Sequence, residues 1–440
     1  MEDYLIDALS FKLKPGASHI TNRRSVTFYP HGGNQYSPTG VKVIKMVLTG
    51  DQWLDPGTVR LQFTLRNTET TAGRKLRTVS GPWSFFRRVR ILAGGQILED
   101  MDDYNRIHEM FHIMQDPNNR ANDDVEGFGA RWDSATVDAT TYPSIDTGLT
   151  RTVMFKLLSG VFNQEKFLPI RYMPITIELE LTSIMSDPIF FPSDFVATSA
   201  AATPFTAANT SGLWGIEDVQ IKCDVCALDN ALDNEYAQHL LSGKSLPINY
   251  NTYVSQTQMM VGQNQNINVT RALTRLKSVF INFDKQRVGK NTQAAGLHTS
   301  KSFNDFFHSM GGNVANAYDP GREVELQIQI GSKLFPEYPI RSLGEAFYQL
   351  KKTLGIHTSS FHNIDIPEAL YRNRKFIVGI DTEKVLSAGF TGLNTKAGDL
   401  MTIRVKQMST DPPSQADKMQ IILHADMILN IRDTGVEVME

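Results

Sequence analysis

The sequence has little cysteine, little net charge and no long hydrophobic run. Its 2 cysteines among 440 residues exclude a disulfide framework and are typical of a reducing compartment. A formal net charge of −3 excludes a surface coated with positive charge for nucleic acid, although one basic face stays compatible with it. No stretch approaches the apolar length of a membrane span. We therefore expect no membrane span, and the acidic N-terminus predicts no secretory signal peptide.

Length and composition predict a globular protein with more than one core. With 440 residues, 41% of them hydrophobic and 21% charged, the chain is too long for one ordinary core. Residues 183–213 lose the hydrophobic pattern, and the run TSAAATPFTAANTSG within them is typical of a linker. We predict an N-terminal arm at 1–14, a first domain at 15–212 and a second domain at 213–440.

Most patterned segments alternate apolar and polar residues, which predicts β-strands. The alternation is clearest at 58–65 and 174–181, and paired glycines between 85–92 and 96–98 predict a hairpin. Three short segments have helical spacing instead. They are 104–114, 228–241 with Gly243 as a stop, and 342–354 with Ser342 as a cap and Gly355 as a stop. The predicted fold class is all-β, built of sandwiches with short helices inserted in loops.

One turn sequence occurs twice, each time before an alternating strand. Asp55-Pro56-Gly57 precedes one strand, and the same three residue types at 319–321 precede another at 324–330. We predict that the two strands are counterparts in two similar β domains, with Leu61 and Leu326 both in a core. The repetition is weak evidence by itself, because Pro and Gly favour any turn.

The sequence HEMFH at 108–112 matches the H-E-x-x-H pattern of zinc peptidases. On a helix, His108 and His112 lie one turn apart and can bind Zn²⁺, while Glu109 acts as general base. A third ligand is missing, because the metzincin positions hold Gln115 and Asn118. The next glutamates, at 126 and 165, do not lie in helical patterns. We predict structural roles for all three motif residues, with no catalytic residue, no metal and no cofactor.

Two further motifs are incomplete. Cys223 and Cys226 form a single C-x-x-C in an alternating strand, where an offset of three places the thiols on opposite faces. We predict two buried or half-buried thiols. Gly243-Lys244-Ser245 resembles the end of a P-loop, but Gln238 stands where the first glycine is needed, and the motif follows a helix. We therefore exclude an ATPase role.

Two groups of arginines are candidates for contact with phosphate. They are Arg23-Arg24 and the cluster of Arg87, Arg88 and Arg90. Charged residues at strand positions usually form solvated faces or ion pairs within the fold, and this is the interpretation we favour. No aromatic residues interleave with them to form a groove for single-stranded nucleic acid.

A further set of segments, spread along the chain, points to one known family. These segments are 50–56 with the following strand, 86–104 with its Gly-Gly-Gln hairpin, 165–169 with the following strand, 243–247, 330–333 with 336–339, and 430–438. Through them the chain resembles the double jelly-roll major capsid proteins of adenovirus-like and giant-virus-like DNA viruses, and looks most similar to the compact versions of polinton-like viruses. The resemblance covers nearly the whole chain, although no single motif in it is as specific as a metal signature.

The resemblance implies two consecutive eight-stranded jelly rolls, one in each predicted domain. It implies a homotrimeric, pseudo-hexagonal capsomer that contacts neighbouring capsomers, penton proteins and minor capsid proteins in an icosahedral shell around double-stranded DNA. The protein is then made inside a host cell, resides in the virion and touches the genome weakly on the inner face of the shell. The long segments 115–150 and 284–318 would form outer towers or clasps between subunits.

Two other functions are compatible with parts of the sequence. One is a zinc metallopeptidase that uses His108, Glu109 and His112, and stoichiometric zinc lost on His112→Ala would favour it. The other is a minor virion component such as a vertex or spike protein. Vertex proteins of this lineage are usually single jelly rolls, so the length of the chain argues against that role.

Overall fold

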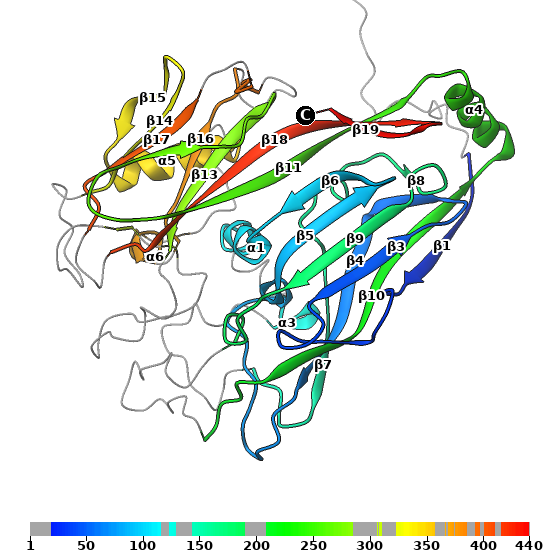
Figure 1. Ribbon diagram of the computed structural model, residues 1–440, viewed down its shortest axis with the longest axis horizontal. Coiled ribbons are helices and arrows are strands. Elements are labelled where there is room, and N and C mark those ends of the chain that lie inside the picture. Colours follow the sequence, from blue (N-terminus) through cyan, green and yellow to red (C-terminus); the bar gives the residue numbers. More distant parts are fainter. Residues whose placement is uncertain are drawn as a thin grey trace, which may run out of the picture.

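The computed structural model describes residues 19–115, 123–128, 143–189, 208–284, 306, 308–309, 323–356, 366, 368–373, 375–384, 392–396, 400–409 and 415–439. Strands dominate this part of the chain and form four antiparallel sheets, with short helices between them (Figure 1).

The described strands of the N-terminal half pair into two sheets. One sheet has the order β1-β10-β4-β7, with β2 and β8 added to it, and the other has the order β3-β9-β5-β6. These strands are β1 (Ile20–Phe28), β2 (Gln35–Tyr36), β3 (Val43–Leu48), β4 (Trp53–Asn67), β5 (Phe86–Ala93), β6 (Gln96–Met101), β7 (Thr150–Phe155), β8 (Leu168–Pro169), β9 (Ile175–Leu181) and β10 (Trp214–Leu228). A 3-10 turn (Pro82–Phe85) and the helices α1 (Tyr104–His112) and α3 (Asp123–Glu126) lie between them.

The C-terminal half repeats this arrangement. One sheet has the order β11-β18-β13-β16, with β19 added, and the other has the order β12-β17-β14-β15. The strands are β11 (Leu246–Met259), β12 (Gln265–Val269), β13 (Leu276–Asp284), β14 (Glu325–Ile330), β15 (Lys333–Ile340), β16 (Ile377–Asp381), β17 (Met401–Lys406), β18 (Lys418–Arg432) and β19 (Gly435–Met439). The helices are α4 (Asn230–Leu241), which joins the halves, α5 (Leu343–Thr353) and α6 (Glu368–Asn373).

Both halves therefore share one topology. When the eight main strands of each half are counted along the chain, one sheet has the order 1-8-3-6 and the other 2-7-4-5 in both cases. This is the order of a jelly roll, in which two Greek keys fold into a double sheet. The predicted fold class, two consecutive eight-stranded jelly rolls, is confirmed. We call β1 to β10 the first jelly roll and β11 to β19 the second.

The sheet pairings correct the predicted domain limits. Strand β10 pairs with β1 and with β4, so residues 214–228 complete the first jelly roll. The predicted limit at 212/213 would cut through that sheet. The patternless segment 183–213 therefore precedes the last strand of the first jelly roll and does not separate the two halves, because β10 still fills the place between β1 and β4. The chain leaves the first jelly roll after Leu228, at α4.

The two strands that share the turn sequence are not counterparts. Strand β4 is third in the first jelly roll and β14 is fourth in the second, so the counterpart of β4 is β13. Asp55 also lies inside β4, where the register with β10 shifts, so this Asp-Pro-Gly is an irregularity of the strand and not a preceding turn. The second copy, at 319–321, lies outside the described residues. The burial of Leu61 and Leu326 is confirmed, at 0% and 2% exposure.

The alternation and the helix signals otherwise predicted the local structure well. Every apolar residue of the alternating part of β4 is fully buried, as are those of β9. The three predicted helices correspond to α1, α4 and α5. Ser342 caps α5 by accepting a hydrogen bond from the Glu345 amide at 3.2 Å. Gly243 and Gly355 follow α4 and α5 with φ of 81° and 72°, the left-handed conformation that ends a helix.

The two jelly rolls meet along β6, α1 and β11. The long strands β11 and β18 run from the second jelly roll along the first (Figure 1). Helix α1 lies near the place where the two jelly rolls approach each other (Figure 1). The Tyr250 hydroxyl of β11 donates to the Leu98 carbonyl of β6 at 2.8 Å. The Ser255 hydroxyl of β11 donates to the Asp102 carbonyl at 2.7 Å, just before α1. This contact region, which we call the junction, holds the H-E-x-x-H helix.

Candidate functional site

Helix α1 places the H-E-x-x-H residues at the junction. Its apolar side chains Tyr104 and Ile107 are fully buried, as predicted from their helical spacing. The helix starts after Asp103, whose left-handed backbone (φ 50°) turns the chain out of β6. His112 is 5% exposed and Glu109 is 1% exposed. Both are buried polar groups and need partners inside the fold.

Glu109 is engaged in hydrogen bonds with the first jelly roll. Its carboxylate accepts from the Trp83 indole N–H at 2.7 Å and from the Ser80 hydroxyl. His112 lies on the next turn, with Nδ1 4.0 Å from the Glu109 carboxylate. A general base must reach the proton that it abstracts, usually on a water molecule. The Glu109 carboxylate instead holds Trp83 of the 3-10 turn against α1, and the structural role of the motif residues stays a prediction.

The two histidine rings pack on the same tryptophan. The Trp83 ring lies 4.2 Å from the His108 ring, stacked at 18°, and 4.4 Å from the tilted His112 ring. His108 Nε2 is also 3.4 Å from the Lys156 carbonyl. Burial lowers the pKa of His108 to about 3, and the neighbouring His112 contributes to the shift. At neutral pH His108 is therefore an uncharged, packed side chain.

The predicted position of Glu126 is wrong in one respect. We expected this residue in a loop, but it ends the short helix α3 and lines the same cavity as both histidines. Even so, no three His, Cys, Asp or Glu side chains are grouped to hold a metal ion in the described part of the chain. Gln115 also lines the cavity, whereas position 118 lies outside the described residues. The absence of a metal stays a prediction.

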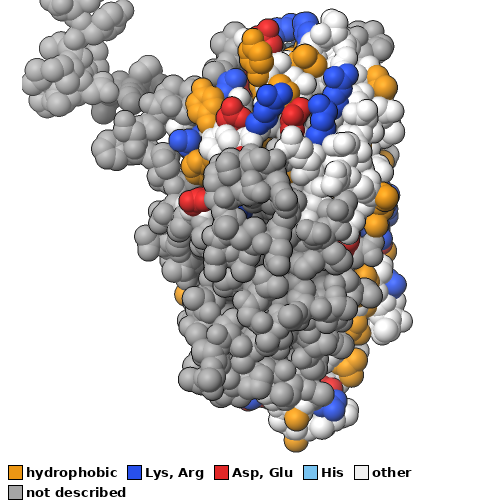
Figure 2. All heavy atoms as spheres, turned by 90° about the vertical axis from the view of Figure 1, so that its left-hand side faces the viewer, with side chains coloured by type: hydrophobic (Ala, Val, Ile, Leu, Met, Phe, Trp, Pro, Cys, Tyr) orange, Lys and Arg blue, Asp and Glu red, His pale blue; other side chains and the backbone are white. Residues whose placement is uncertain are grey.

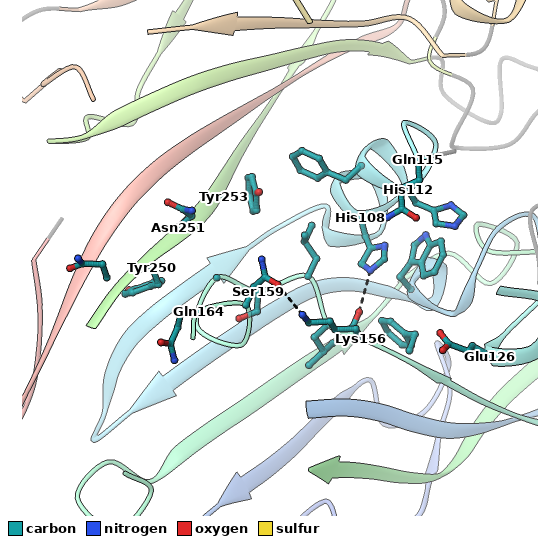
Figure 3. A pocket seen from close by; sticks show the side chains of 18 residues that line it. His108, His112, Gln115, Glu126, Lys156, Ser159, Gln164, Tyr250, Asn251 and Tyr253 are labelled. Carbon is teal, nitrogen blue, oxygen red and sulfur yellow. Dashed lines mark hydrogen bonds between the residues drawn. The ribbon is translucent and has the colours of Figure 1, made fainter. Parts of the chain in front are cut away.

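The cavity at the junction has a volume of about 450 Å³. Figure 3 shows His108 and His112 of α1 on one side and Tyr250, Asn251 and Tyr253 of β11 on another. The segment 156–164, which follows β7, lines it between them. The cavity thus lies where side chains of both jelly rolls meet, and its shape depends on how they are held together.

Sequence reasoning missed Glu99, a buried carboxyl at this junction. Glu99 is 1% exposed and accepts hydrogen bonds from the Gly160 amide at 2.8 Å and from the Ser159 hydroxyl. Thr252 of the second jelly roll also hydrogen-bonds to it. Burial raises the pKa of Glu99 to about 7, although these donors favour the charged form. The available signal was a glutamate that shares a strand face with the buried Met101.

A second missed residue, His424 of β18, packs behind the cavity. Its ring stacks on Tyr253 at 4.9 Å, and its Nδ1 lies 3.1 Å from the Ser278 hydroxyl. Tyr253 in turn contacts Phe111 of α1, with ring centroids 4.9 Å apart. Burial lowers the pKa of His424 to about 3, and the charge of Lys277 adds to the shift. His424 is therefore held neutral in the folded protein.

We expect His424 to make the protein less stable as the pH falls. Its pKa is lowered on folding, so between pH 6.5 and about 3 the unfolded chain binds a proton that the folded protein does not. At pH 5 this difference amounts to up to about 2 kcal/mol. The loss of unfolding free energy between pH 7 and pH 5, measured by denaturation, should be smaller in His424→Gln by that amount.

The control for this measurement is His31→Gln, since the His31 side chain is exposed. Glu99 acts in the opposite direction, because a raised carboxyl pKa makes the folded protein bind the extra proton between pH 7 and 4.5. That contribution is present in all three proteins and cancels in the comparison. An equal loss in wild type and His424→Gln would contradict the assignment of a buried neutral His424.

The remaining candidate residues have structural partners. Both cysteines are free and buried, as predicted. Gly243-Lys244-Ser245 connects α4 to β11. Four of the candidate arginines form ion pairs with acidic residues of the first jelly roll. These pairs are Arg23 with Asp55 and Asp224, Arg87 with Asp102, Arg88 with Asp100, and Arg90 with Glu178. Within the described residues, no helix is long and apolar enough to cross a membrane.

Comparison with solved structures identifies similar folds over the whole chain. VP54 of PBCV-1, as fitted into a reconstruction of the virophage Sputnik, matches with a TM-score of 0.63 at 10% identity, covering 98% of this chain and 99% of that one. The Faustovirus major capsid protein matches with a TM-score of 0.60 at 11% identity, covering 97% of this chain and 93% of that one. A chain of a quasi-atomic model of the PBCV-1 capsid matches with a TM-score of 0.61 at 12% identity, covering 98% of this chain and 99% of that one.

No protein-family model matches the sequence, and no curated protein matches it either. The similarity is therefore one of structure, at sequence identities of 10–12%. It agrees with the strand order derived above, and it confirms the double jelly-roll resemblance at the level of the fold. The chain has the double jelly-roll fold that the Faustovirus major capsid protein also has.

Proposed function

We propose that this chain is the major capsid protein of a double-stranded DNA virus, without enzymatic activity. It forms pseudo-hexagonal homotrimers that assemble into an icosahedral shell, and so resides in the virion after synthesis in the host cell. The observation that carries the proposal is the pair of jelly rolls with identical strand order, which matches capsid protein structures over 97–98% of this chain. Two similar modules in each of three subunits supply six wedges around one axis.

The state of the H-E-x-x-H residues supports a structural role over a peptidase. The Glu109 carboxylate is occupied by Trp83 and Ser80, and His108 is packed and neutral. We propose that the chain uses no catalytic residue, no metal and no cofactor. We also propose that an N-terminal arm at 1–14 precedes two jelly-roll domains. The boundary between these domains lies at α4, because β10 pairs within the first jelly roll.

The surface of the second jelly roll has features of a face that contacts other molecules. Strand β15 is the edge of its sheet, and its Tyr338 is 81% exposed. Figure 2 shows hydrophobic side chains among positive and negative ones on the described part of this end of the molecule. Exposed apolar groups on an edge strand favour contact with a partner. We assign such faces to neighbouring subunits and capsomers, with penton and minor capsid proteins as further partners.

Contact with the genome is weak in this proposal. Four of the five candidate arginines pair with acidic neighbours, for example Arg88 with Asp100 at 2.7 Å. A phosphate would have to compete with these carboxylates, which lowers the gain from each contact. The predicted towers or clasps at 115–150 and 284–318 lie largely outside the described residues, and their role stays a prediction.

We expect the purified chain to be a stable trimer. Obligate interfaces between subunits bury more than about 2,000 Å², so the trimer should persist on dilution to nanomolar concentration. Native mass spectrometry should give three times the chain mass of 49.3 kDa. Electron microscopy of the same sample should show particles with threefold symmetry and a near-hexagonal outline. A monomer at micromolar concentration would contradict the capsid proposal.

A further inference from the structure

An ion pair joins the two jelly rolls at the junction. Arg106 of α1 lies in the first jelly roll, and its side chain is 14% exposed. Its Nη1 is 3.6 Å from the carboxylate of Asp187, which follows β9 in the same jelly roll. Its Nε is 3.5 Å from the carboxylate of Asp284, the last residue of β13 in the second jelly roll. The guanidinium therefore bridges carboxylates from both jelly rolls.

The carboxylates around Arg106 are more deeply buried than the arginine. The side chains of Asp187 and Asp284 are 9% and 3% exposed. Burial acts to lower the pKa of Arg106, but the attraction of Asp187 and Asp284 outweighs it and leaves the pKa raised. Lys418 is paired in register with Asp284, and its pKa is lowered by burial and by the charge of Arg106. The positive side chains of Arg106 and Lys418 therefore lie beside the negative side chains of Asp187 and Asp284.

The other contacts named between the two jelly rolls are single hydrogen bonds and ring contacts. The Thr257 hydroxyl donates to Asp103 at 2.8 Å, and Phe111 packs edge-on against Phe280 at 5.3 Å. A lost hydroxyl contact can be replaced by a water molecule at little cost. Removing the arginine takes one positive charge away from two buried carboxylates, which costs more than the loss of a hydroxyl contact. Arg106 therefore contributes an electrostatic resistance to opening of the junction.

We propose that Arg106 is a positioning residue that fixes the angle between the two jelly rolls, and that this angle is required for closed shells. The second part rests on the proposed capsid function. A rigid planar guanidinium with two separate donors suits this role, since one group holds two carboxylates in defined directions. A subunit whose jelly rolls change their angle can still fold and trimerise. Its capsomers, however, no longer fit one common lattice.

The test compares Arg106→Met and Arg106→Lys with wild type and with a matched control, Arg88→Met. Arg88 also pairs with a carboxylate, Asp100, but both residues lie in the first jelly roll. Each protein is examined for thermal unfolding, for trimer mass and for shells by electron microscopy. The spread of the angle between the jelly rolls is measured in images of single trimers. This spread is a readout that general destabilisation would not change in a folded trimer.

We expect Arg106→Met to form trimers with a broader spread of angles and at least tenfold fewer closed shells than wild type. Arg106→Lys should recover part of the loss, because one ammonium keeps the charge but cannot hold both carboxylates equally well. Arg88→Met should behave like wild type. If Arg106→Met does not fold, Asp284→Asn removes the charge on the side of the second jelly roll and should broaden the angles in the same way.

Two outcomes would overturn the inference. One is a folded Arg106→Met, or in its place Asp284→Asn, with the angle spread and shell yield of wild type. The other is an equal loss in Arg88→Met, which would show that any charge removal has this effect. If wild type itself forms neither trimers nor shells, the capsid proposal fails instead. The angle between the jelly rolls is then measured on the wild-type and variant chains directly, and an unchanged angle overturns the role of Arg106.

Discussion

Phe63→Ala should lower the free energy of unfolding by about 3–5 kcal/mol, as is typical of removing a buried phenylalanine. Phe63 lies in β4 and is 0% exposed. Its ring packs edge-to-face against Phe86 at 5.5 Å and against Phe85 at 6.2 Å. The truncation leaves a cavity between β4 and β5, which belong to the two facing sheets of the first jelly roll, and the loss is comparable with the whole stability of an ordinary domain.

Chemical denaturation at one fixed protein concentration measures this loss, because the stability of an oligomer depends on concentration. Gln62→Ala is the matched control, since Gln62 is the adjacent residue on the opposite face of β4 and is only half-buried. We expect it to cost less than about 1 kcal/mol. Phe63→Ala protein that is as stable as wild type and assembles normally would contradict the assignment of this face to the core.

Gly160→Ala should disrupt the junction, at a cost of about 3 kcal/mol, the upper end of the usual range for adding atoms to a tightly packed interior, because the clash is with backbone. A Cβ atom at this position would lie 1.5 Å from the carbonyl oxygen of Asn251 in β11 and 2.6 Å from its carbonyl carbon. These are backbone atoms, so no side-chain rotation relieves the clash. The segment carrying Gly160 must move away from β11, and the hydrogen bond from its amide to Glu99 is then strained or lost.

Hydrogen exchange of the β11 amides and the thermal unfolding temperature both report this change. Gly33→Ala is the control, because nothing lies within 4 Å of a Cβ atom there and the residue has no positive φ. We expect protection of β11 to fall in Gly160→Ala and to stay unchanged in Gly33→Ala. An unfolding temperature of Gly160→Ala equal to that of wild type would show that the two jelly rolls do not press together at this residue.

The sequence predicted the strands more reliably than their partners. Alternation has the period of a strand whose one face is buried, so it locates both the strand and its inner face, as Leu61 and Phe63 show. It carries no information about which strand lies alongside. For that reason the repeated turn sequence suggested that β4 and β14 are counterparts, although they occupy the third and fourth places of their jelly rolls.

The candidate site likewise has a part that the sequence predicted and a part that it did not. The H-E-x-x-H helix was predictable from its spacing and from the apolar face that carries Tyr104 and Ile107. The residues that define its surroundings were not predictable. Trp83 is 26 positions away from Glu109, and Arg106 meets Asp284 across 178 positions. Both contacts depend on how distant segments pack, which no local pattern contains.

The sequence by itself determined the all-β class, the inner faces of the strands, the positions of three helices and the resemblance to a double jelly roll. These features follow from local steric preferences and from the burial of apolar side chains, both of which act over a few neighbouring residues. Only the tertiary structure decided that β10 closes the first jelly roll, that Glu109 is held by Trp83, and that Glu99 and Arg106 lie at the junction. Those outcomes depend on contacts between segments far apart in the chain, where a buried polar group must find a partner wherever the packing of the sheets places one.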